Sequence, residues 1–181
     1  MNWKKMMAVG LAAVSMMAFV TGCGGDTKKA NTELPKKVVI GLDDSFPPMG
    51  FKDEKGEIVG FDIDMAKEAA KRAGMDVEFK AIDWSSKEAE LKSKKIDALW
   101  NGLTVSPERE KNILFSNVYM KDKQYIIVRN EDESIKGKAD LADKVVGVQQ
   151  ASTGEAALQK DESGKTVKEI KSYADFVSAF M

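Results

Sequence analysis

The sequence has no histidine and a single cysteine among its 181 residues. These shortages exclude Ser-His-Asp and Cys-His nucleophilic sites, and they exclude zinc sites built from histidine and cysteine. The chain also lacks a G-x-x-x-x-G-K-[ST] phosphate loop and a G-x-S-x-G nucleophile turn. Any acid–base chemistry would fall on Asp, Glu, Lys or Tyr side chains. We expect neither a metal ion nor a cofactor.

The overall composition is typical of a soluble globular protein, with 43% hydrophobic and 31% charged residues. A chain of this length allows one or two small domains. The formal net charge is −1, whereas a nucleic-acid-binding protein presents a basic surface. We therefore expect no nucleic-acid partner.

The N-terminal segment has the pattern of an export signal. Lys4 and Lys5 give a positively charged start, and an uncharged, mostly apolar run follows from residue 6 to residue 20. A membrane-spanning helix needs about 20 apolar residues, and this shorter run is typical of a secretory signal peptide. We predict that residues 1–22 form that signal peptide.

The only cysteine, Cys23, directly follows the small residues Val20, Thr21 and Gly22. This arrangement resembles a bacterial lipobox, in which cleavage precedes the cysteine and the thiol receives lipid. We expect a lipidated Cys23 and a flexible tether over residues 23–35, which would anchor an extracytoplasmic protein to the bacterial cell membrane. An uncleaved membrane anchor with an incidental cysteine is the alternative.

From residue 36 onward, short apolar runs alternate with helical patterns. Strands are predicted at residues 38–40, 77–81, 96–100, 125–128 and 145–148. Helices are predicted over 62–73 with a Gly74 cap, from a Ser85–Glu88 capping box, from the Ser106 cap with Pro107, and from Glu155. A charged surface loop with a short helix is expected over 130–143. This alternation predicts an α/β fold with a parallel or mixed sheet.

Two strand-to-helix turns have the composition of anion-binding sites. After one strand come Asn101, Gly102, Thr104 and then Arg109, whose planar guanidinium matches a carboxylate and which we place in an exposed first helical turn. After another strand, residues 149–154 read Gln-Gln-Ala-Ser-Thr-Gly. Ligands of open α/β sheets bind at the carboxyl ends of strands. A solvated surface arginine and an ordinary capped turn are the alternatives.

Aromatic residues supply a second feature of a pocket. Phe46 and Trp84 both follow predicted strand ends, and Asp43 and Asp44 precede Phe46. The alternatives are core packing for the aromatic rings and turn formation for the aspartates.

Several segments, in order along the chain, together resemble the polar amino-acid-binding proteins of ABC importers. They are GLDDSFPPMGF (41–51), GFDID (60–64), KIDALWNGLTVSPER (95–109), FSNVY (115–119) and DKVVGVQQASTGE (143–155). The resemblance implies a two-lobed, type II periplasmic-binding-protein fold whose lobes close over the ligand around a hinge. It implies a first lobe at 36–118, a hinge crossing at 119–123 and a second lobe from 124 to 181.

The resemblance also implies roles for individual residues. Arg109 and Thr104 would bind the ligand α-carboxylate, Ser152 and Thr153 would add donors to it, and the Gly102 carbonyl would accept from the α-ammonium. Phe46 and Trp84 would flank the ligand side chain. The distal part of that side chain would contact Asp43, Asn101 and Gln149, which suit a cationic or a neutral polar amino acid.

The sequence departs from the family pattern at two places. Ala151 stands where the family commonly has glycine. The final segment has a helical apolar pattern from Ser172 (Tyr173, Phe176, Val177, Phe180, Met181), where family members continue with another second-lobe strand and return to the first lobe. We therefore expect a second lobe that is partial in this chain.

The expected function is to capture a polar L-amino acid outside the cytoplasmic membrane and deliver it to an ABC permease, without catalysis. One alternative is an enzyme on the same fold, such as a periplasmic dehydratase or a peptidoglycan lyase. Another is a sensor or a truncated product that does not bind.

Overall fold

The computed structural model describes residues 34–181. The predicted signal peptide, Cys23 and nearly all of the predicted tether lie outside the described residues. Among residues 34–181, no helix is long and apolar enough to span a membrane.

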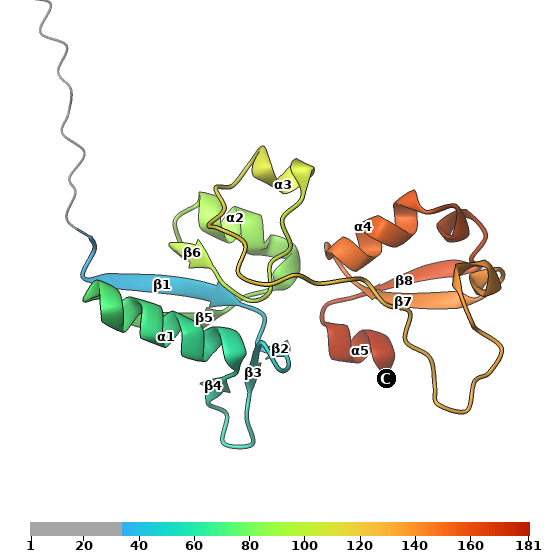
Figure 1. The fold of residues 1–181 in the computed structure, drawn as a ribbon, viewed down its shortest axis with the longest axis horizontal. Coiled ribbons are helices and arrows are strands. Elements are labelled where there is room, and N and C mark those ends of the chain that lie inside the picture. The colour runs from blue at the N-terminus through green and yellow to red at the C-terminus, as the bar shows by residue number, and fades with distance from the viewer. Residues whose placement is uncertain (1–33) are drawn as a thin grey trace, which may run out of the picture. The chain divides into compact units, whose positions relative to one another are not determined.

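A parallel sheet forms the core of the first part of the described chain (Figure 1). Its strand order is β5 (Asp76–Ala81), β1 (Lys37–Leu42) and β6 (Ala98–Leu99). In the two pairings, Lys37 lies opposite Asp76 and Ile40 lies opposite Ala98. The three strands predicted from the sequence in this region are confirmed, although the third is shorter than predicted. Parallel pairing brings the carboxyl ends of these strands to one edge of the sheet.

Helix α1 (Phe61–Ala73) packs against β5. Its apolar stripe of Ile63, Ala66 and Ala70 is buried. Gly74 ends the helix in the left-handed conformation, with φ 69°, as the sequence predicted.

The next helical segment begins two residues earlier than predicted, with Asp83 rather than Ser85 as its cap. The 3-10 turn η1 (Trp84–Ser86) leads directly into α2 (Lys87–Lys92). The Asp83 carboxylate accepts from the Ser85 N–H at 2.8 Å and from the Ser85 hydroxyl at 2.7 Å. The predicted Ser85 capping box is therefore wrong. The carboxylate of Asp83, two residues earlier, is the stronger acceptor and caps the segment instead.

A small antiparallel sheet that the sequence did not predict lies between β1 and α1 in the chain. It consists of β2 (Ser45–Phe46), β3 (Gly50–Lys52) and β4 (Ile58–Val59). Strands this short carry too little alternation to be recognised. The sheet holds Phe46 in position.

Helix α3 (Pro107–Glu110) begins as predicted, with the Ser106 hydroxyl accepting from the Arg109 N–H at 3.3 Å. The predicted strand at 125–128 is wrong. Tyr125, Ile126 and Ile127 are exposed, and none of the described strands pairs with them. An apolar run forms a strand only where a neighbouring strand accepts its hydrogen bonds.

A second parallel sheet pairs β7 (Val145–Gln149) with β8 (Glu169–Tyr173). Between them lie α4 (Thr153–Lys160) and the 3-10 turn η3 (Glu162–Lys165), while η2 (Lys138–Leu141) precedes β7. Helix α5 (Phe176–Phe180) follows and packs against both strands. The predicted α/β class is confirmed.

The predicted start of the last helix is wrong, because Ser172 and Tyr173 belong to β8. The helix begins at Phe176, where the Asp175 carboxylate accepts from the Ser178 N–H at 2.7 Å. In β8 only Ile170 and Tyr173 are half-buried, and they lie three positions apart. The strand therefore has no alternating apolar pattern to outweigh the helical spacing in the sequence.

Candidate ligand-binding site

The residues that were predicted from the sequence to bind the ligand all line one cavity of about 820 Å³. They are Asp43, Phe46, Trp84, Asn101, Gly102, Thr104, Arg109, Gln149, Ser152 and Thr153. The cavity is as large as those that hold small-molecule ligands, which have volumes of about 300–1,000 Å³.

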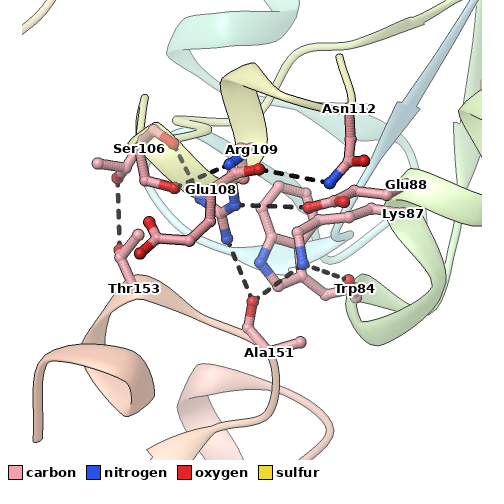
Figure 2. A network of polar contacts seen from close by, with 10 residues as sticks. Trp84, Lys87, Glu88, Ser106, Glu108, Arg109, Asn112, Ala151 and Thr153 are labelled. Atoms are coloured by element: carbon pink, nitrogen blue, oxygen red, sulfur yellow. Dashed lines mark hydrogen bonds and ion pairs between the residues drawn. The ribbon is translucent and has the colours of Figure 1, made fainter. Parts of the chain in front are cut away.

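Arg109 is buried, with 9% of its surface exposed, so the expected exposed position is wrong. Its Nη1 donates to the Thr104 carbonyl at 2.9 Å and its Nη2 to the Ala151 carbonyl at 3.2 Å (Figure 2). Its Nε lies 3.7 Å from the Glu88 carboxylate. Burial lowers the pKa of the Arg109 guanidinium, and Glu88 acts in the opposite direction. The guanidinium remains charged, because an arginine pKa lies far above neutrality.

The turn before α4 supplies an oxygen to this arginine. Ala151 has φ 55°, the left-handed region that glycine adopts most easily. Its N–H donates to the Glu155 carboxylate at 2.7 Å, and the Ser152 hydroxyl accepts from the Glu155 N–H at 3.0 Å. The turn therefore follows the path that a glycine would favour, even though an alanine occupies the position.

Two of the three predicted hydroxyl donors, Thr104 and Thr153, lie close together. The Thr104 and Thr153 hydroxyl oxygens are 3.5 Å apart. The Gln124 side-chain amide also donates to the Thr153 hydroxyl, at 3.3 Å. The Thr104 hydroxyl donates to the Asp122 carboxylate at 3.0 Å. A threonine hydroxyl has a single hydrogen, so a ligand anion would take the place of Asp122 at this donor.

Lys87 is a buried cation at this site that the sequence analysis missed. Only 2% of its surface is exposed, and its Nζ donates to the Trp84 carbonyl at 3.0 Å and the Ala151 carbonyl at 2.9 Å. The ammonium also lies 5.0 Å from the centre of the Trp84 ring. A lysine in the first turn of a helix looks like a surface residue in sequence, so no local pattern distinguished it.

A carboxylate marks another part of the cavity. Asp43 is 6% exposed and accepts from the Ser45 N–H at 2.9 Å and the Ser45 hydroxyl at 2.6 Å. The Asn101 side-chain oxygen accepts from the Asp43 N–H at 3.1 Å. Phe176, which the sequence analysis also missed, packs edge-on against Phe46, with ring centres 5.8 Å apart.

The backbone N–H of Gly102 is hydrogen-bonded to the buried carboxylate of Asp62. This N–H donates to Asp62 at 2.7 Å, and the Tyr119 hydroxyl donates to the other Asp62 oxygen at 2.8 Å. Burial raises the pKa of the Asp62 carboxyl, while the two hydrogen bonds act against it. Gly102 has φ 60°, a conformation that other residues rarely adopt. The fixed N–H leaves the carbonyl of this residue for another partner.

The site therefore combines cations, hydroxyls and a carboxylate in one partly apolar cavity. Such a set has the donors and acceptors that a small zwitterionic molecule needs for hydrogen bonding and charge pairing. These features are those expected of an α/β solute-binding protein with a cavity for a small charged ligand.

The match to a family model supports this class. Residues 38–174 match the bacterial extracellular solute-binding proteins, family 3. The chain belongs to this family, as its sequence motifs predicted.

The similar proteins include amino-acid-binding proteins. The chain is 37% identical over 152 residues to the arginine-binding extracellular protein ArtP of Bacillus subtilis, covering 84% of this chain and 58% of that protein. An ancestral arginine-binding protein solved with arginine has a TM-score of 0.77 and 42% identity, with coverage of 81% of this chain and 64% of the other. An ancestral amino-acid-binding protein described as a precursor of cyclohexadienyl dehydratase has a TM-score of 0.74 and 34% identity, with coverage of 80% and 64%. The chain thus spans less than two thirds of the length of each of these relatives.

Proposed function

We propose that this chain is the substrate-binding component of an ABC-type amino-acid importer and that it captures a polar L-amino acid outside the cytoplasmic membrane. The single observation that carries the proposal is the buried Arg109 guanidinium facing the same cavity as Thr104 and Thr153. A guanidinium presents two parallel donors to a carboxylate. Membership of the solute-binding family supports the same proposal.

In this proposal the ligand α-carboxylate binds Arg109, with Thr104, Ser152 and Thr153 adding donors. The Gly102 carbonyl accepts from the α-ammonium. Phe46 and Trp84 contact the ligand side chain, and Asp43, Asn101 and Gln149 contact its distal end. The segments 36–118, 119–123 and 124–181 serve as first lobe, hinge crossing and second lobe. The hydrogen bond between Arg109 and Ala151 joins the first and last of these segments.

Asp43 favours a ligand whose side chain is cationic. Its carboxylate is nearly buried and, among the described residues, has no lysine or arginine nitrogen within ion-pair distance. A buried charge is stabilised by an opposite charge. A guanidinium or ammonium on the ligand would supply that charge at the Asp43 end.

The mature protein is proposed to be held at the outer face of the bacterial membrane through lipid on Cys23, after removal of residues 1–22. The V-T-G-C sequence after an apolar run supports this localisation. Membrane permease subunits of an ABC transporter would then receive the amino acid from the captured complex.

The test is a thermal-shift screen of the proteinogenic L-amino acids, followed by calorimetry of the best one and of its α-carboxamide. We expect one or a few polar amino acids to bind, and we expect the carboxamide to bind at least about tenfold more weakly. Mass spectrometry of the mixture should recover the amino acid unchanged. Absence of binding by every amino acid contradicts the proposal, and turnover of the bound molecule favours an enzyme.

A further inference from the structure

Two cations donate to a single backbone oxygen in the candidate site. The Ala151 carbonyl accepts from Lys87 Nζ at 2.9 Å and from Arg109 Nη2 at 3.2 Å. Figure 2 shows both side chains directed at this oxygen from different helices. The remaining acceptors of these cations are the backbone carbonyls of Trp84 and Thr104.

The negative charge around these two cations is small. Glu88 lies 3.7 Å from the Arg109 guanidinium. Among the described residues, no Asp or Glu oxygen lies within 4.0 Å of the Lys87 ammonium. Neutral carbonyl oxygens only partly replace the solvation that a buried cation loses. The pair would therefore be stabilised by an anion at the position of the Ala151 oxygen.

The pKa of Lys87 is shifted by its burial and by the neighbouring charges. Burial lowers its pKa to about 8, and the nearby Arg109 acts in the same direction. Glu88 on α2, Asp83 before η1 and Glu155 on α4 act in the opposite direction, but less strongly. An anion in contact with Lys87 would raise its pKa again, because an opposite charge favours the charged form.

We propose that Lys87 is a second cation for the ligand carboxylate and binds it together with Arg109. A ligand carboxylate oxygen that displaces the Ala151 carbonyl from these two donors would accept both hydrogen bonds and bring a negative charge. Lys87 thereby makes the site select for a fully ionised carboxylate. The inference rests on the proposed amino-acid-binding function and adds a residue to it.

The binding test compares Lys87→Met and Lys87→Arg with wild type. The probe is the amino acid that gives the largest shift in the thermal screen, titrated by calorimetry. Lys92→Met serves as the matched control, because Lys92 is an exposed lysine on the same helix. We expect Lys87→Met to bind about ten- to a hundredfold more weakly, since a charge-assisted hydrogen bond is lost. Lys87→Arg should retain part of the affinity, and Lys92→Met should match wild type.

A proton-linkage measurement separates carboxylate binding from a merely structural contact. Titrations at pH 8 in buffers of different ionisation enthalpy give the number of protons taken up on binding. Free Lys87 is about half protonated there, so contact with the carboxylate should produce uptake of up to about half a proton. The uptake should disappear in Lys87→Met and Lys87→Arg.

Two results would overturn the assignment of Lys87. One is proton release, or no proton exchange, in a wild-type protein that binds the amino acid; Lys87 would then only hold the Ala151 carbonyl. The other is a folded Lys87→Met protein with wild-type affinity. In both cases the proposed function would stand. If no amino acid binds to wild type, the proposed function itself fails, and the role of Lys87 fails with it.

Discussion

Gln149 donates a hydrogen bond from its side-chain amide to the Asp43 carboxylate, with Nε2 and Oδ2 2.6 Å apart. The two residues are 106 positions apart in the chain. Gln149 ends β7, and Asp43 directly follows β1, so the contact joins the carboxyl ends of strands from two different sheets. Both residues line the candidate cavity, where they place a negative charge beside a neutral amide.

Replacing Asp43 with asparagine should change the preference among ligands. The substitution removes the charge but keeps nearly the same shape, so a cationic side chain loses its counter-charge while a neutral one loses little. We expect the ratio of L-arginine to L-glutamine affinity to fall at least about tenfold, roughly 1.4 kcal/mol. Calorimetric titration of both amino acids measures this ratio. An unchanged ratio would show that Asp43 does not face the ligand side chain.

Replacing Ala151 with glycine should stabilise the protein. Ala151 has φ 55°, and a non-glycine residue in this region is strained by roughly 1–2 kcal/mol. The greater freedom of glycine in the unfolded chain offsets about 0.5–1 kcal/mol of that gain. We expect a net increase of about 0.5–1 kcal/mol in the free energy of unfolding, measured with urea. The substitution leaves the Lys87 and Arg109 side chains unchanged, so ligand affinity should stay within about threefold of wild type.

Ala142→Gly is the matched control for this substitution. Ala142 has φ −52°, which an alanine adopts without strain. Its replacement should therefore lower stability, and a gain at both positions would contradict the explanation from backbone strain.

The Asp62 carboxyl should make stability depend on pH in a defined direction. Its pKa is raised above the ordinary 3.8, mainly by burial. A carboxyl with a higher pKa in the folded chain favours folding fully below its unfolded pKa, and this contribution is lost as pH rises through the folded pKa. We expect the stability of wild type relative to Asp62→Asn to fall as the pH rises above about 4. Urea unfolding of both proteins at several pH values measures the difference in their free energy of unfolding. A difference that stays constant or rises with pH would contradict this prediction.

Cys23→Ala should leave the protein without lipid and release it from the membrane. A single acyl chain binds a membrane only marginally, so stable anchoring takes two signals, as a diacylglycerol on the thiol would provide. Metabolic labelling with palmitate, followed by membrane fractionation, measures the effect. Cys23 is the only cysteine, so wild type that fails to incorporate label would rule out the lipoprotein proposal.

The sequence predicted the helices next to the first sheet well because their ends have strong local signals. The Gly74 cap and the Ser106 cap with Pro107 both form as expected. The segment at 125–128 was mispredicted because strand formation depends on a partner that composition does not reveal. At the C-terminus, a helical spacing of apolar residues extended across the boundary between β8 and α5.

The candidate site was predictable where residues follow strand ends, since parallel strands bring those positions together. Lys87 and Phe176 were missed for a different reason. Each becomes part of the cavity through a contact distant in sequence, with Ala151 for Lys87 and with Phe46 for Phe176. Such contacts depend on how segments far apart in the chain are brought together, and no local spacing encodes them.

The central claim is that Arg109 binds the ligand carboxylate, and calorimetric titration of wild type, Arg109→Lys and Arg109→Ala tests it most directly. Arg72→Ala is the control, because Arg72 is an exposed arginine that pairs only with Glu68 among the described residues. Circular dichroism melts of every variant are needed, since Arg109 is buried and bonds to two carbonyls. We predict that Arg109→Ala loses about 2–5 kcal/mol of binding free energy, roughly 30- to several-thousand-fold in affinity. Arg109→Lys should recover only part of it, because an ammonium lacks the planar pair of donors. A folded Arg109→Ala protein that binds within about threefold of wild type, roughly 0.65 kcal/mol, would contradict the account.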